Sequence, residues 1–327
     1  MTDDTATIDE LAALREGAAV AAHGLRACVR VSGDDHREWL DRISSMPIIP
    51  LEPGRFTWST LMDGKGKMRC DMRVAHLGDA GDAGSLLVEL PASHHANLMR
   101  VLDMYILRDK VELTDLSASH TMVSVLGPRA EAGLADAGLP VPGDDRVVSA
   151  DGVHAMAARL FGVPGADLLV EADAADALVE TLVGAGALRV GRAALDVVRV
   201  EAGVPWFAED MADAVIPLEA GLDEHVSITK GCYPGQEVVA RIANLGQVAR
   251  KLVRLSAPGA APVASGSELL GTGERIGKPA GTLTSVVHDP GSDRTLALGY
   301  ARRAFWKDGS EVTADGVTFR VEGPARP

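Results

Sequence analysis

Cysteine and aromatic residues are scarce in this 327-residue chain. The first shortage argues against a cysteine-ligated metal site, and the second argues against a core rich in aromatic side chains. Its three cysteines, Cys28, Cys70 and Cys232, form no C-x-x-C pair and no spacing typical of zinc or iron-sulfur ligation. The nine histidines are scattered, so we expect no metal site. Aromatic residues make up 4% of the chain, and the core must therefore be built mainly from aliphatic side chains. A Trp or Tyr beside a motif is for that reason a candidate pocket residue.

An excess of positive charge and long apolar runs are also lacking. The formal net charge is -14, which disfavours non-specific binding to nucleic acid or to anionic membranes, because both present phosphates. Anionic ligands can still bind through local arginines. No segment reaches the apolar length needed to span a bilayer, and the first residues are acidic. We expect a cytoplasmic protein with no nucleic-acid or membrane partner.

The hydrophobic pattern predicts an α+β region followed by a β-rich one. The length favours two or three domains, and residues 1–24 resemble an acidic, Ala-rich lead-in. The periodicity then predicts six strands and three helices in two similar halves. The predicted strands are 25–31, 55–62, 67–74, 86–90, 122–126 and 168–171, and the predicted helices are 39–46, 93–107 and 178–183. The first helix follows a candidate capping box that begins at Ser32.

The pattern changes after Gly246 to short β-rich runs separated by Gly, Pro and Asp. These runs predict a small antiparallel β-barrel with strands at 251–255, 282–287, 295–300 and 317–321. We place the boundary near residue 247, which gives one region over 1–246 and a barrel domain over 247–327.

A hairpin is predicted around the turn Asp63-Gly64-Lys65-Gly66, and its second strand carries Asp71, which has two possible roles. Alternation along the second strand puts Cys70 on the apolar face and Asp71 on the other face, beside Arg69 and Arg73. Asp71 either pairs with one of these arginines on a solvated strand face or belongs to a functional site.

Residues 230–241, KGCYPGQEVVAR, combine a lone thiol with glycines, two cations and an amide-carboxylate pair. A thiol beside Gly231 and after Lys230 can be accessible and reactive, because a nearby positive charge favours the thiolate. A solitary cysteine is also a common small filler of apolar cores. Composition alone leaves both interpretations of Cys232 open.

Residues 199–206, RVEAGVPW, form a second motif at the end of a further short helical stretch, in which Ala194, Leu195 and Val198 pack and whose end Gly203 marks. Glu201 can accept paired N–H donors from a ligand, since a carboxylate presents two acceptor oxygens. The alternative is a helix-end salt bridge between Arg199 and Glu201.

These motifs carry a resemblance to a known family. KGCYPGQE resembles the K-G-C-Y-x-G-Q-E signature of the YgfZ family, and residues 63–68, DGKGKM, resemble its D-x-K-G-K-M hairpin. RVEAGVP resembles the R-x-E-x-G-x-P motif of the wider aminomethyltransferase superfamily. The resemblance implies two ferredoxin-like halves followed by the barrel, bound tetrahydrofolate, and transient partners that are iron-sulfur enzymes or cluster-assembly proteins.

The resemblance also implies roles for single residues. It makes Cys232 the functional thiol and Glu201 the residue that grips the pterin ring. Arg241 becomes a candidate for the anionic tail of folate, with Lys230 and Arg199 as rivals. Tyr233 and Trp206 are candidates for stacking on the pterin or, equally, for packing at an interface.

Asp71 keeps a second function open. It stands where aminomethyltransferases carry an aspartate near the reactive folate nitrogens, whereas many YgfZ-type proteins have an uncharged amide there. The resemblance therefore implies a folate-binding accessory factor for iron-sulfur enzymes, with a folate-dependent aminomethyl or methyl transferase as the alternative.

Overall fold

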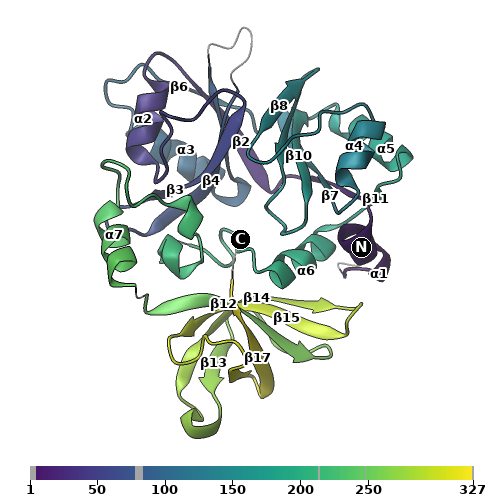
Figure 1. Ribbon diagram of the computed structural model, residues 1–327, viewed down its shortest axis with the longest axis vertical. Helices are drawn as coiled ribbons and strands as arrows, with labels where there is room; N and C mark the ends of the chain where they lie inside the picture. The colour runs from purple at the N-terminus through teal and green to yellow at the C-terminus, as the bar shows by residue number, and fades with distance from the viewer. Residues whose placement is uncertain (1–4, 78–83, 213, 247, 326–327) are drawn as a thin grey trace.

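The computed structural model describes residues 5–77, 84–212, 214–246 and 248–325. Two α+β halves lie side by side above a barrel, as Figure 1 shows. The predicted α+β region followed by an antiparallel barrel is confirmed. Within the described ranges, no helix has both the length and the apolar character needed to cross a membrane.

The first half is a five-stranded sheet in the order β3-β4-β5-β2-β6, with α2 and α3 beside it. The predicted hairpin forms as β3–β4 with its turn after Met62, and Gly66 takes a positive φ of 72° in this turn. The bounds of these elements are β2 Arg26–Ser32, α2 His36–Ile43, β3 Arg55–Met62, β4 Met68–His76, β5 Leu86–Pro91, α3 His95–Met104 and β6 Glu112–Asp115.

The second half is a six-stranded sheet in the order β11-β1-β7-β10-β9-β8. Its bounds are α1 Ile8–Glu16, β1 Ala19–His23, β7 His120–Leu126, α4 Ala130–Asp136, β8 Val147–Ala150, β9 Val153–Ala157, β10 Gly165–Glu171, α5 Ala175–Gly184, β11 Leu188–Arg189 and α6 Arg192–Ala202. The prediction of a lead-in over 1–24 was wrong, because α1 and β1 lie in this stretch. β1 pairs antiparallel with β7 although about a hundred residues separate them. A strand that precedes the whole first half in the sequence therefore belongs to the sheet of the second half.

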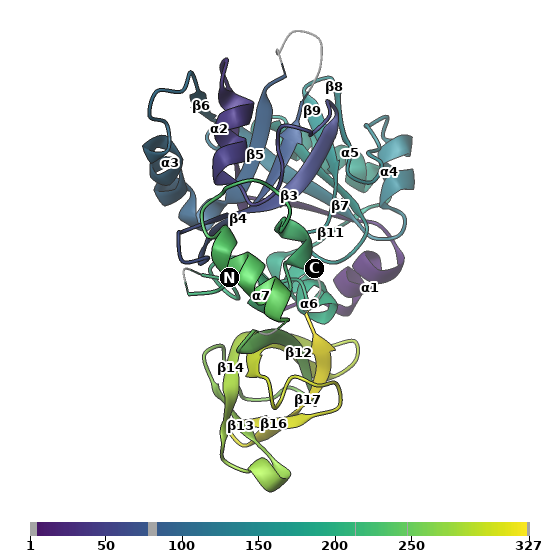
Figure 2. The same ribbon diagram turned by 60° about the vertical axis from the view of Figure 1, so that its left-hand side comes forward.

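Helix α6 and helix α7, Gln236–Leu245, lie between the two halves and the barrel (Figure 2). The barrel is closed, in the order β12-β15-β14-β13-β16-β17. Its strands are β12 Arg250–Pro258, β13 Glu268–Gly271, β14 Pro279–Asp289, β15 Arg294–Arg302, β16 Glu311–Ala314 and β17 Val317–Pro324. Four were predicted, and the two missed strands, β13 and β16, are four residues long. Residue 247 lies outside the described residues, so the predicted domain boundary stays a prediction.

The capping box predicted to begin at Ser32, before helix α2, is not formed. Helix α2 begins after Asp35, whose side chain makes no capping hydrogen bond to the helix. Gly33 has a φ of 107°, and a Cβ there would meet the Lys110 carbonyl oxygen at 2.2 Å. The close approach of the neighbouring backbone, rather than a side-chain cap, shapes this entry to the helix.

Candidate functional site

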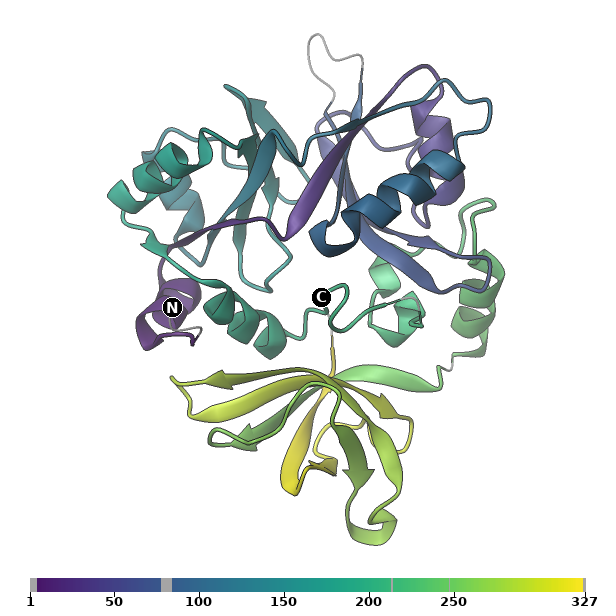
Figure 3. The same cartoon turned by 180° about the vertical axis from the view of Figure 1, so that it is seen from behind.

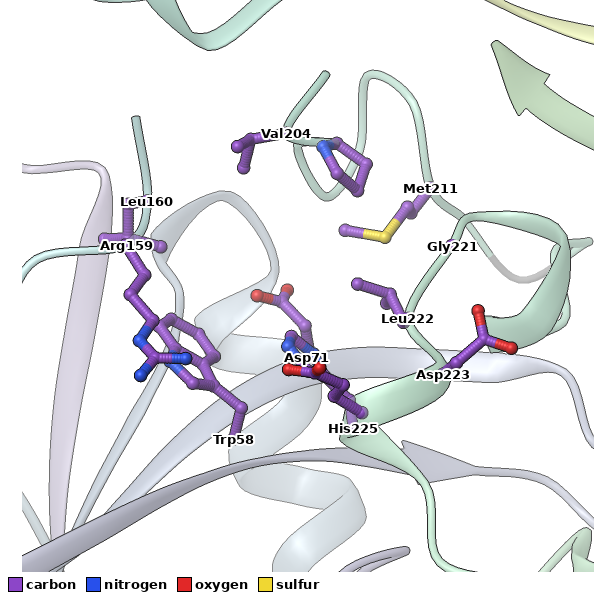
Figure 4. A pocket seen from close by; sticks show the side chains of 12 residues that line it. Trp58, Asp71, Arg159, Leu160, Val204, Met211, Gly221, Leu222, Asp223 and His225 are labelled. Atoms are coloured by element: carbon purple, nitrogen blue, oxygen red, sulfur yellow. The ribbon is translucent and has the colours of Figure 1, made fainter. Parts of the chain in front are cut away.

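A cavity of about 260 Å³ opens beside the β3–β4 hairpin, where the first half meets the segments that follow β9 and α6 (Figure 4). Aromatic, aliphatic and charged side chains line it together. The lining residues are Trp58, Asp71, Arg159, Leu160, Val204, Pro205, Met211, Gly221, Leu222, Asp223, Glu224 and His225. Such a mixture of apolar wall and few polar groups is typical of a small-molecule site.

Asp71 lies on β4 and projects into this cavity towards Val204 and Met211. Its Oδ2 atom accepts a hydrogen bond from the Arg26 Nη1 atom at 2.9 Å. Its Oδ1 atom is buried and has no hydrogen-bond partner. A buried carboxylate oxygen without a donor is costly, and a ligand N–H would satisfy it.

The alternative in which Asp71 pairs with Arg69 or Arg73 on a solvated face is wrong. Asp71 is 6% exposed and Arg73 is fully buried, because the second half covers this side of the strand. Arg73 binds Glu89 and Asp167 instead, and Arg69 forms an ion pair with Asp63 at 3.7 Å. The prediction that Cys70 is a core residue is confirmed.

Trp58 and His225 form one wall of the cavity. Their rings are stacked, with centroids 5.5 Å apart and an angle of 11° between the planes. Burial lowers the pKa of His225 to about 4, so the ring is neutral near pH 7. The wall is therefore a flat, uncharged aromatic surface next to a carboxylate.

Three predicted residues of the second motif lie outside the cavity lining. Glu201 is half exposed and accepts hydrogen bonds at 2.6 and 3.1 Å from Arg15, so the alternative pair with Arg199 is not formed either. Arg199 is buried and binds Asp196, Glu209, Asp210 and Ser285. Trp206 is buried and stacks on Phe161 at 5.7 Å.

The loop of the first motif also lies outside the cavity lining. Cys232 is exposed, and the Gln236 Nε2 atom lies 3.9 Å from its sulfur. The Lys230 side chain is 4% exposed and donates to the carbonyl oxygens of Asp41, Ser44 and Met46, at the C-terminal end of α2. Burial lowers the pKa of Lys230, although Asp41 opposes this shift. Lys230 therefore anchors the loop to α2.

Tyr233 and Arg241 differ in their surroundings. Tyr233 is buried, and its hydroxyl donates to the Ser227 carbonyl oxygen at 2.6 Å. Arg241 is exposed on α7. Neither residue lines the cavity beside Asp71.

The motifs at 63–68 and 230–237 meet in space. Gly235, at the start of α7, has a φ of 85°, and a Cβ on it would lie 2.7 Å from the Gly66 Cα atom. The turn of the hairpin that carries Asp71 thus packs directly against the loop that carries Cys232. Helix α7 lies beside the turn end of the hairpin (Figure 3).

Sequence reasoning missed several residues of the cavity and its support. Arg26 was not singled out because it is one of several polar positions on an alternating strand. Arg159 and His225 were not singled out because they lie outside the sequence motifs. The one signal for Arg26 is a charge on a strand predicted to be half-buried, since a cation in such a place needs a carboxylate partner. Among the described residues, no group of three or more His, Cys, Asp or Glu side chains is placed to hold a metal ion.

The family model described as GCVT N-terminal domain matches residues 2–230, which is more than half of the chain. The chain belongs to this family. The GCVT match takes in both α+β halves, Asp71 and the motif at 199–206, and it ends at Lys230, just before Cys232.

Relatives of this GCVT protein agree with the family. It is 26% identical over 311 residues to the "Putative transferase At1g60990, chloroplastic" of Arabidopsis thaliana, covering 91% of this chain and 69% of that protein. It is 26% identical over 319 residues to the aminomethyltransferase of Synechococcus sp. (strain WH7803), covering 89% and 80% respectively. The crystal structure of glycine cleavage system aminomethyltransferase T from Bartonella henselae superposes with a TM-score of 0.86 at 22% identity. That superposition covers 97% of this chain and 88% of the other. The fold is therefore aminomethyltransferase-like.

Proposed function

We propose that this protein binds tetrahydrofolate in the cavity beside Asp71 and supports the assembly or repair of iron-sulfur enzymes through Cys232. The observation that carries the proposal is the Asp71 carboxylate, which lines the cavity and whose buried Oδ1 atom has no hydrogen-bond partner in the protein. Membership of the GCVT family and the YgfZ-like loop support the same ligand and the same role.

The cavity suits a reduced pterin for chemical reasons. The ring is flat and carries several N–H groups, and a carboxylate accepts such donors in charge-assisted hydrogen bonds. The stacked rings of Trp58 and His225 add aromatic surface to the cavity lining, against which the ligand ring can pack. The aliphatic lining from Leu160, Val204 and Leu222 excludes water and strengthens the polar contact to Asp71.

Glu201 is the second candidate for the pterin contact, on the strength of its motif. Arg15 holds only the Oε2 atom of Glu201, but Glu201 does not line the cavity, whereas Asp71 does. Asp71 is the contact that the geometry favours.

The role of Cys232 depends on access. Its thiol is exposed and lies outside the cavity lining, so a protein partner can reach it while the cavity is filled. We propose that client iron-sulfur enzymes or cluster-assembly proteins meet this face. Lys230 and Tyr233 hold the loop in place, and Arg241 on the exposed face of α7 can contact such a partner.

The second candidate is a folate-dependent aminomethyl or methyl transferase. The placement of Asp71 in the cavity favours it, and the relative from Synechococcus is named an aminomethyltransferase. In this reaction, Asp71 would orient the amine whose one-carbon unit passes to tetrahydrofolate.

Complementation separates the two functions. In cells that lack the protein, Cys232→Ala should fail to restore iron-sulfur enzyme activity although the variant folds and binds tetrahydrofolate. Full rescue by Cys232→Ala would refute the role of the thiol. Release of a one-carbon unit from an aminomethyl donor by the purified protein, and its loss in Asp71→Asn, would establish the transferase instead.

A further inference from the structure

A chain of buried charges of alternating sign begins at Asp71 and runs across the two halves. It comprises Asp71, Arg26, Glu89, Arg73 and Asp167, each with a side chain at most 9% exposed. Arg26 binds Asp71 at 2.9 Å and Glu89 at 2.8 Å, and Arg73 binds Glu89 at 2.7 Å and Asp167 at 2.9 Å. Each arginine therefore bridges two carboxylates.

Arg26 fixes the orientation of the Asp71 carboxylate. Its Nη1 atom holds Oδ2, and Oδ1 remains without a donor in the protein. Its Nε atom is held by Glu89, whose other oxygen is held by Arg73. A guanidinium bound on two sides has little freedom to rotate, so the carboxylate beyond it is held in one orientation.

The same two arginines support the aromatic wall. The guanidinium carbons of Arg26 and Arg73 lie 5.8 and 5.3 Å from the centre of the Trp58 ring. These distances are typical of a cation packed on an aromatic face. One buried cluster therefore sets the positions of both the acceptor and the flat surface of the cavity.

We propose that Arg26 is the positioning residue of the ligand site: it presents the free oxygen of Asp71 to a ligand N–H donor and acts on the ligand only through Asp71. The inference rests on the proposed binding of a flat, N–H-bearing ring in this cavity. Arg26 itself does not line the cavity. Its contribution should therefore vanish when the Asp71 carboxylate is absent.

A double-mutant cycle tests this dependence. Tetrahydrofolate is titrated into the wild type, Arg26→Gln, Asp71→Asn and the double variant. We expect Arg26→Gln to weaken binding by about tenfold, the loss typical of one hydrogen bond to a charged group, and to add little in the Asp71→Asn background. Equal losses in both backgrounds would overturn the proposal, because a purely structural role does not depend on Asp71. Arg294→Gln, which removes an exposed barrel arginine that binds Glu322, is the matched control.

Two further measurements keep the result decisive. Arg26→Lys keeps the charge and should restore part of the lost affinity, and it replaces Arg26→Gln if that variant does not fold. A crystal structure of the Arg26 variant should show the Asp71 carboxylate rotated from its wild-type position, and an unmoved carboxylate would refute the positioning role. Absence of tetrahydrofolate binding by the wild type would refute the proposed function, whereas the crystal structure would still decide the role of Arg26.

Discussion

Arg15 and Glu201 form an ion pair at 2.6 Å that joins α1 to α6, and Arg15 also reaches Asp289 of the barrel at 2.8 Å. Arg15 thus connects α1 both to Glu201, the acidic position of the R-x-E-x-G-x-P motif, and to the barrel. Glu201 is 49% exposed at its side chain, which limits how much the pair can stabilise the fold.

Glu201→Gln is therefore expected to lower the free energy of unfolding by only about 0.5 kcal/mol, as exposed ion pairs do. The variant should keep its affinity for tetrahydrofolate, because Glu201 does not line the cavity beside Asp71. Urea unfolding and calorimetric titration measure the two effects. A large loss of affinity with normal stability would place the ligand beside Glu201.

Arg199→Leu is expected to destabilise the protein by about 3–5 kcal/mol, because it leaves the buried Asp210 carboxylate without its cation. Arg199 binds Asp196, Glu209 and Asp210 and also reaches the barrel through Ser285. Urea unfolding at fixed pH gives the change. Arg241→Leu is the control, since Arg241 is exposed on α7 and should shift the midpoint little.

Gly235→Ala should cost at least about 2 kcal/mol, because it combines an unfavourable φ with a backbone clash. Gly235 has a φ of 85°, and the added Cβ would lie 2.7 Å from Gly66 and 2.8 Å from the Asp63 carbonyl oxygen. Gly231→Ala is the matched control in the same loop, where a Cβ meets nothing within 4 Å. Equal melting temperatures for the two variants would contradict the close packing of the two motifs.

His23 makes stability depend on pH. Burial lowers the pKa of His23 from 6.5 to about 4, so the unfolded chain binds more protons than the folded one between these values. Stability should fall as the pH drops through this window, with a slope of up to about 1.4 kcal/mol per pH unit from this residue. His23→Gln should reduce the slope. His225, whose pKa is also lowered to about 4, accounts for a remaining part.

The sequence predicted the elements of this fold better than their contacts. Hairpin β3–β4 and the long barrel strands follow from alternation and turn residues, which are local signals. Strand β1 was missed because its sequence, AVAAH, shows no alternation of apolar and polar residues, and the short strands β13 and β16 carry too few residues for a period to be visible.

The candidate site shows the same limit. Alternation placed Asp71 on the polar face of β4, but only the packing of the two halves shows that this face is buried and that Arg26 is the partner. The motif at 230–241 identified an exposed Cys232, whereas the anchoring of Lys230 on α2 depends on a contact across nearly 190 residues. Residue type and spacing predict chemistry, and the buried partner of a charge requires the tertiary structure.

The central claim is that the ligand binds beside the unpartnered oxygen of Asp71, and one comparison tests it most directly. Tetrahydrofolate is titrated calorimetrically into the wild type, Asp71→Asn and Glu201→Gln under the same conditions. Binding by the wild type and Glu201→Gln with at least about tenfold weaker binding by Asp71→Asn is the predicted result. Unchanged binding by Asp71→Asn, or no binding by the wild type, would contradict the account.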